Sequence, residues 1–114
     1  MRVWSLDREG LVAQVTALAA RLAREFPEVV QVVLFGSAAE GRALPSSDVD
    51  LLVVVSSSQQ RFLERADRYR PLFEPLEMGL DLFVYTSDEA ATVPLARGAL
   101  AKGRTLFARA GRGT

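Results

Sequence analysis

Two long apolar runs constrain the fold of this chain more than any other feature of its sequence. Residues 29–35, VVQVVLF, and residues 48–55, DVDLLVVV, are rich in β-branched side chains and almost continuously apolar. Such a pattern is typical of a strand that is buried on both faces, because a strand with one wet face would alternate polar and apolar residues. The sequence therefore predicts a sheet with these two strands inside it and helices covering both sides.

Helix and strand patterns surround these two runs. Apolar residues recur at helical spacing in the first part of the chain, and Pro27 ends that pattern. Helices are expected at 7–26, at 59–70, in a short stretch from 87, and at 94–102. Further strands are expected at 80–85 and 104–107. The order predicts a small α/β domain, with residues 1–107 as a single domain and 108–114 as a flexible C-terminal tail.

Composition limits the chemistry that is open to the chain. The 114 residues provide room for about one domain, and fourteen basic side chains balance fourteen acidic ones. The chain has no Cys and no His, which excludes thiolate nucleophiles, zinc knuckles and the Ser-His-Asp triad. A site made of carboxylates without imidazole favours a hard cation such as Mg²⁺. With no signal-peptide pattern and no apolar run of about 18 residues, we expect a cytoplasmic protein. Because the net charge is zero, we expect no membrane contact and no direct nucleic-acid binding.

Two acidic residues open the second apolar run, where the sequence otherwise favours burial. Asp48 and Asp50 are two positions apart, so a strand would place them on one face about 6.6 Å apart. Carboxylates converging to about 5 Å repel each other by roughly 3 kcal/mol at an effective dielectric of 20, and a divalent cation between them removes this cost. The alternative is that Asp48 caps a loop and Asp50 is solvated at the strand end, which is commoner for a lone Asp-x-Asp.

Two further features could belong to the same site. Gly36 and Ser37 follow the first apolar run, where a glycine allows close backbone approach and a turn can bind phosphate. The alternative is a plain turn. Asp81 interrupts the apolar strand at 80–85, and it could complete a three-carboxylate cluster if that strand lies beside 48–55. Glu77 and Asp88 are weaker candidates for the same role, because both are expected in loops.

Taken together, these features form one arrangement: a buried strand, Gly-Ser, ten residues, then Asp-x-Asp opening a second buried strand. The segment FGSAAEGRALPSSDVDLLV resembles the signature of the DNA polymerase β-like nucleotidyltransferases, and the resemblance covers most of the chain. More narrowly, the chain resembles the minimal single-domain members that act as MntA-like antitoxins beside a HEPN toxin. The resemblance implies an α+β fold in which helices flank a small mixed β-sheet, the polymerase β-like palm core.

The resemblance also implies a site and a reaction. Asp48, Asp50 and Asp81 would be catalytic and would hold two Mg²⁺ ions, with Mn²⁺ as a substitute. Gly36 and Ser37 would bind the phosphates of ATP or another nucleoside triphosphate. The chain would transfer AMP to a hydroxyl, by resemblance a Tyr, of a partner HEPN toxin and so act as its antitoxin. Assembly as a homo- or hetero-oligomer stays open.

One departure and two alternatives accompany this interpretation. Many relatives carry Arg where this chain has Glu40, and a carboxylate close to the triphosphate would be unfavourable. Either Glu40 points to solvent, or nucleotide binding is weakened. The chain could instead be a non-catalytic antitoxin that neutralises its partner by covering it, with the Arg-bearing helix at 59–70 as the docking face. A solvated helix surface is the commoner explanation of Arg61, Arg65 and Arg68. A third hypothesis is nucleotidyl transfer to a small molecule such as an aminoglycoside.

Overall fold

The structure, a computed structural model, describes residues 8–36, 49–76 and 79–109. Its elements follow the expected order. They are α1 (Arg8–Glu25), β1 (Val29–Phe35), β2 (Val49–Val55), α2 (Phe62–Tyr69), the 3₁₀ helix η2 (Arg70–Phe73), β3 (Leu80–Thr86), α3 (Ser87–Ala90), α4 (Pro94–Lys102) and β4 (Arg104–Ala108). The four strands form one sheet in the order β3-β2-β1-β4.

The two apolar runs occupy the two central positions of this sheet. β1 pairs antiparallel with both β2 and β4, whereas β2 pairs parallel with β3, so the sheet is mixed as expected. Five of the seven residues of β1 and six of the seven of β2 are buried. The parallel pair β2–β3 is joined through α2 and η2, because parallel neighbours need a long crossover connection.

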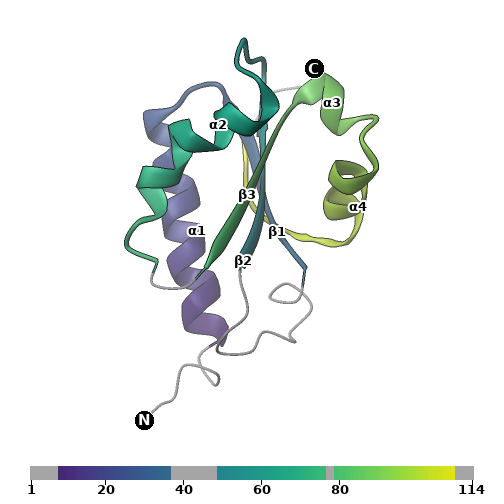
Figure 1. Cartoon of the computed structure of the whole chain (residues 1–114). Coiled ribbons are helices and arrows are strands. Elements are labelled where there is room, and N and C mark those ends of the chain that lie inside the picture. The colour runs from purple at the N-terminus through teal and green to yellow at the C-terminus, as the bar shows by residue number, and fades with distance from the viewer. Residues whose placement is uncertain (1–7, 37–48, 77–78, 110–114) are drawn as a thin grey trace.

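Helices α1 and α2 cover one face of the sheet, and α3 and α4 cover the other (Figure 1). The α1/α2 face holds the larger apolar core, to which α1 contributes residues at helical spacing. These are Val12, Val15, Leu18, Ala19, Leu22 and Ala23. The smaller core on the α3/α4 face is built from the alternate residues of the strands, such as Val33, Leu52 and Val54, and from the alanines of α3 and α4.

A hydrogen-bonded pair ties α2 to the start of β1. The hydroxyl of the buried Tyr69 donates to Glu28 Oε2 at 2.7 Å, and Arg68 Nε lies 3.0 Å from the same oxygen. Burial, together with the Glu28 hydrogen bond, raises the pKa of Tyr69 to about 12. The ring of Phe26 stacks edge-on against Tyr69 at 4.9 Å between centroids, which fixes the end of α1 against α2.

Arg109 anchors the chain after β4. Its Nε and Nη2 donate to the carbonyl of Val29 at 3.0 and 2.8 Å, and Nη2 also donates to the carbonyl of Ala23 at 3.0 Å. β4 itself runs through Ala108, one residue beyond the expected strand. Ordered contacts therefore continue to residue 109, and the predicted tail stays a prediction only for residues 110–114, which lie outside the described residues.

Candidate active site

The strand register brings two of the three predicted carboxylates together. β3 lies directly beside β2, and Asp50 is paired with Asp81 across the two strands. Because hydrogen-bonded strands lie about 4.8 Å apart, the two side chains start from neighbouring backbone positions. Both belong to the α3/α4 face, since the residues beside them, Val49 and Leu82, point into the opposite core.

Gly36 completes this end of the sheet. It follows β1, whose last residue, Phe35, is paired with Asp50. The φ of Gly36 is +80°, a conformation that side chains rarely adopt, and a Cβ built there would collide with the carboxylate of Asp50. A glycine is required here for both reasons, and its backbone therefore lies directly against a predicted metal ligand.

Aromatic rings line the sheet beside the carboxylates. Phe35 of β1 and Phe83 of β3 have ring centroids 5.6 Å apart, so they meet above the central strand β2. Phe83 is two residues from Asp81 and shares its face. Asp81 is exposed and Asp50 is half-buried, so both acids lie at the rim of this apolar layer.

The remaining predicted site residues, Ser37 and Asp48, lie outside the described residues, as do Glu40 and Glu77. Within the described residues, no three carboxylates gather closely enough to hold a metal ion. The predicted three-carboxylate cluster therefore depends on Asp48. The donors that the structure does place are two carboxylates on neighbouring strands beside the half-buried Gly36, and carboxylate oxygens are ligands that a hard cation prefers.

The structure corrects two sequence-based expectations about charged residues. Asp88, which we also considered as a loop residue, lies in the first turn of α3, the short helix expected from residue 87, and α3 follows the opposite end of β3 from Asp81. Arg65, expected on a solvated surface, is 7% exposed. Its guanidinium donates to both carboxylate oxygens of Glu89, at 2.6 and 3.2 Å, and to the carbonyl of Val84 at 3.3 Å. Because it is buried and bonded within the domain, Arg65 does not form part of an exposed docking face.

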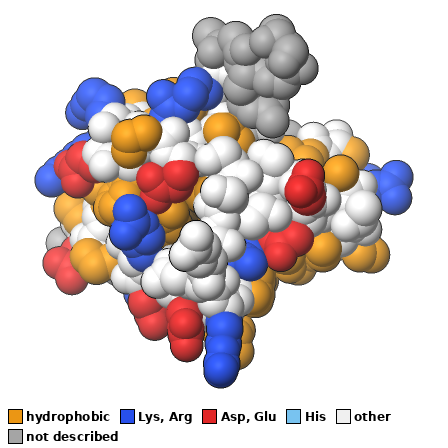
Figure 2. Space-filling view, turned by 90° about the horizontal axis from the view of Figure 1, so that it is seen from above, with side chains coloured by type: hydrophobic (Ala, Val, Ile, Leu, Met, Phe, Trp, Pro, Cys, Tyr) orange, Lys and Arg blue, Asp and Glu red, His pale blue; other side chains and the backbone are white. Residues whose placement is uncertain are grey.

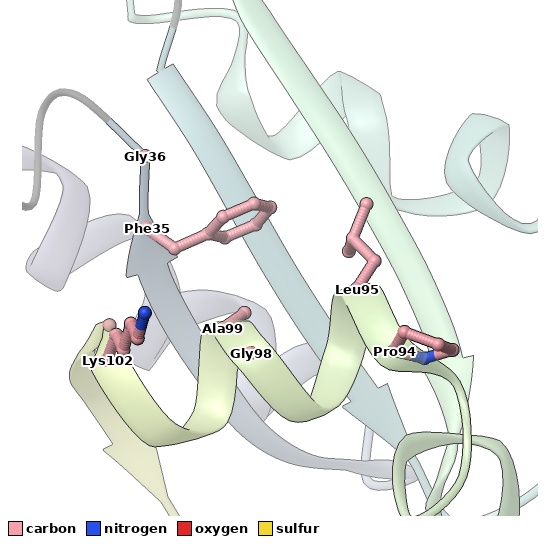
Figure 3. Close-up of a pocket in the computed structure, with 8 residues that line it drawn as sticks. Phe35, Gly36, Pro94, Leu95, Gly98, Ala99 and Lys102 are labelled. Carbon is pink, nitrogen blue, oxygen red and sulfur yellow. The ribbon is translucent and has the colours of Figure 1, made fainter.

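A hollow next to Gly36 is a feature that the sequence analysis missed. It has a volume of about 280 Å³ and lies between the end of β1 and α4 (Figure 3). Its lining is small or apolar apart from Lys102, and it is formed by Phe35, Gly36, Pro94, Leu95, Gly98, Ala99, Lys102 and Gly103. A signal was present in the sequence, since Lys102 is the sole lysine of the chain and Gly98 lies inside a predicted helix.

The end of the molecule at which α3 begins carries mixed charges. Figure 2 views the structure from this end, and its Lys and Arg side chains are interspersed with Asp and Glu rather than gathered in one patch. Among the described residues, no helix combines the length and the apolar character that a membrane span requires.

Comparison with known proteins identifies the family. A family model described as a nucleotidyltransferase domain matches residues 15–92, more than half of the chain. The chain therefore belongs to the nucleotidyltransferase domain family. No curated protein sequence matches it.

Solved structures share the fold at low sequence identity. A crystal structure of a protein from Sulfolobus solfataricus, described as a nucleotidyltransferase, superposes with a TM-score of 0.70 at 19% identity and covers 96% of this chain and 91% of that one. A toxin–antitoxin structure with AMP-PNP gives a TM-score of 0.64 at 20% identity, covering 83% and 74% of the two chains. The MntA–HepT toxin–antitoxin structure gives 0.56 at 18%, covering 82% and 70%. The predicted fold class is thus confirmed.

Proposed function

We propose that this chain is a Mg²⁺-dependent nucleotidyltransferase that transfers AMP from ATP to a tyrosine hydroxyl of a HEPN-domain toxin, and that it acts in the cytoplasm as the antitoxin of that toxin. The observation that carries the proposal is the register that sets Asp50 opposite Asp81, directly beside Gly36, in a chain of the nucleotidyltransferase family. The likeness in fold to toxin–antitoxin structures, one of them with AMP-PNP, supports the choice of nucleotide and partner.

The donor set suits a divalent cation. Two like charges on adjacent strands repel one another, and a cation at this edge would lower that repulsion. In the proposed site Asp48, Asp50 and Asp81 would hold two Mg²⁺ ions. Bound Mg²⁺ supplies charge stabilisation for the oxygens that attack and leave phosphorus. Mn²⁺ has the same preference for oxygen ligands.

The residues of the chain divide the remaining work. Gly36 and Ser37 would bind the β- and γ-phosphates through backbone amides and the serine hydroxyl. Asp81, exposed at the rim, would accept the proton of the acceptor hydroxyl. The acceptor oxygen then bonds to the α-phosphorus, the bond from that phosphorus to the bridging oxygen breaks, and pyrophosphate leaves with the electron pair.

The test uses ATP labelled at the α-phosphate, Mg²⁺ and a purified HEPN-domain toxin. Wild-type protein is expected to label the toxin, and the double variant Asp48→Asn/Asp50→Asn to lose at least about a hundredfold in rate, because removal of the metal ligands removes several kcal/mol of charge stabilisation. Asp67→Asn is the matched control, since Asp67 is an exposed acid on α2. It should label the toxin as the wild type does.

Other outcomes would overturn parts of the proposal. Labelling that survives the double substitution would contradict the metal role. Inhibition of the toxin that persists in the double variant, with no requirement for ATP, would favour an antitoxin that acts by covering its partner. Label transferred to an aminoglycoside in the absence of a partner protein would place the acceptor among small molecules.

A further inference from the structure

The hollow between β1 and α4 differs chemically at its two ends. Figure 3 shows Lys102 at the C-terminal end of α4, beside the end of β1, and Pro94 and Leu95 at the start of the helix. The ring of Phe35 extends from β1 toward Leu95. One end is therefore cationic and the other is apolar and partly aromatic, which suits a ligand with an anionic end and a flat, weakly polar end.

Gly98 in the middle of α4 has no packing reason to be a glycine. A Cβ built there would meet nothing within 4 Å, so the protein itself does not need the space. A glycine inside a helix costs about 1 kcal/mol relative to alanine. Gly98 lines the hollow, and the absence of a side chain there leaves space along α4 that a ligand could occupy.

The position of the hollow connects it with the candidate site. Gly36 belongs to both, because it lines the hollow and lies against the Asp50 carboxylate. Phe35, the other shared boundary, is paired with Asp50 across the strands. A molecule whose phosphates contact Gly36 would therefore adjoin the hollow, because this glycine belongs to its wall. The volume, about 280 Å³, is near the lower end of the roughly 300–1,000 Å³ of small-molecule pockets.

We infer that this hollow binds the nucleotide: its apolar end, with Phe35 and Leu95, takes the nucleoside, and Lys102 contacts the phosphates. The inference rests on the proposed function and extends it, since it assigns the nucleoside pocket and a phosphate-binding residue that the Gly-Ser and Asp-x-Asp pattern does not contain. Lys102 is exposed and has three ammonium donors, which suits a phosphate as a point charge.

The test measures displacement of a fluorescent ATP analogue by ATP and, separately, by inorganic tripolyphosphate, both with Mg²⁺. Gly98→Leu fills the hollow beside the apolar end. It should therefore weaken the binding of ATP by about tenfold or more and leave the binding of tripolyphosphate unchanged. Lys102→Gln should weaken both competitors by about tenfold, because each loses a charge-assisted hydrogen bond. Arg97→Gln, on α4 but outside the lining, is the matched control and should bind both as the wild type does.

Thermal unfolding of the same variants separates ligand binding from folding. Leucine replaces glycine in an exposed helical position, so Gly98→Leu should melt at or above the wild-type temperature while losing ATP. Should Gly98→Leu and Lys102→Gln both bind ATP as Arg97→Gln does, the inference is wrong and the proposed function still stands. Wild-type protein that binds neither ATP nor tripolyphosphate would reject the proposed function itself. Lys102→Gln that weakens ATP alone would overturn the assignment of Lys102 to the phosphates.

Discussion

The two faces of the sheet share the same strands but differ in the side chains that cover them. The α1/α2 face is a continuous core of large aliphatic side chains, many of them fully buried. The α3/α4 face has a smaller core in which the helices contribute alanines, and it also carries Asp50, Asp81 and the hollow. One face of this small domain therefore holds the larger apolar core, and the other carries the candidate site.

The largest expected effect on the free energy of unfolding comes from replacing a buried leucine by alanine on each of the two faces. Leu51 and Leu52 are neighbours in β2 and both are 0% exposed, but Leu51 belongs to the α1/α2 core and Leu52 to the other core. A buried Leu→Ala change costs about 2–5 kcal/mol, depending on how far the surroundings relax. Leu51→Ala should cost about 1 kcal/mol more than Leu52→Ala, because the half-buried rings near Leu52 can shift into the space. Urea unfolding measures both, and equal costs would contradict this expectation.

The second prediction concerns the ion pair that joins the two faces. Arg65 on α2 holds Glu89 on α3. Arg65→Ala should lower the free energy of unfolding by about 1–3 kcal/mol, since a charged hydrogen-bonded group is lost. The exposed pair Arg21–Glu25 provides the control, because Arg21→Ala should change the free energy of unfolding by less than about 1 kcal/mol.

The same pair predicts a pH dependence. The hydrogen bond from Arg65, supported by the backbone N–H of Thr86, lowers the pKa of Glu89 below its ordinary value of 4.5. The stabilisation is therefore fully present above about pH 4.5 and is lost as the pH falls through the lower, folded pKa. Wild-type stability should fall more steeply than that of Arg65→Ala in this acidic range, as followed by urea unfolding at several pH values. Parallel curves would show that the pair does not contribute.

The smallest effect on stability is expected at the candidate site. Asp81→Asn removes one of two like charges that face each other across β2 and β3, so the free energy of unfolding should rise by a few tenths of a kcal/mol, within the ~0.2–1 kcal/mol range of such pairs. Transfer activity should nevertheless fall by about a hundredfold or more. Thermal melting and the labelling assay make the two measurements. A loss of stability together with activity would mean that Asp81 has a structural role instead.

Much of the fold could be predicted from local sequence, because the signals were local. The apolar runs predicted both central strands, and Pro27 predicted the end of α1 to within two residues. The pattern at 59–70 was less exact, since α2 begins at Phe62 and Arg70 already belongs to the 3₁₀ helix that contains Pro71.

The candidate site was predictable where it depended on spacing within a strand and less so where it depended on pairing. Asp81 could be matched with Asp50 only once β3 was known to lie beside β2. The burial of Arg65 depends on Glu89, 24 residues away, which no local pattern reveals. The hollow arises from how α4 packs against the end of β1. The sequence alone therefore could not show that Lys102 and Gly98 lie close to Gly36.

The place of β3 in the sheet has a consequence for what the protein can modify. Among the described strands, β3 has a single neighbour, β2, and forms an outer margin of the sheet, with Asp81 exposed at its start. In the proposed reaction, an acceptor would therefore arrive from the side of the molecule rather than through an opening of fixed width. Such an approach would suit the hydroxyl of a folded macromolecule as well as that of a metabolite.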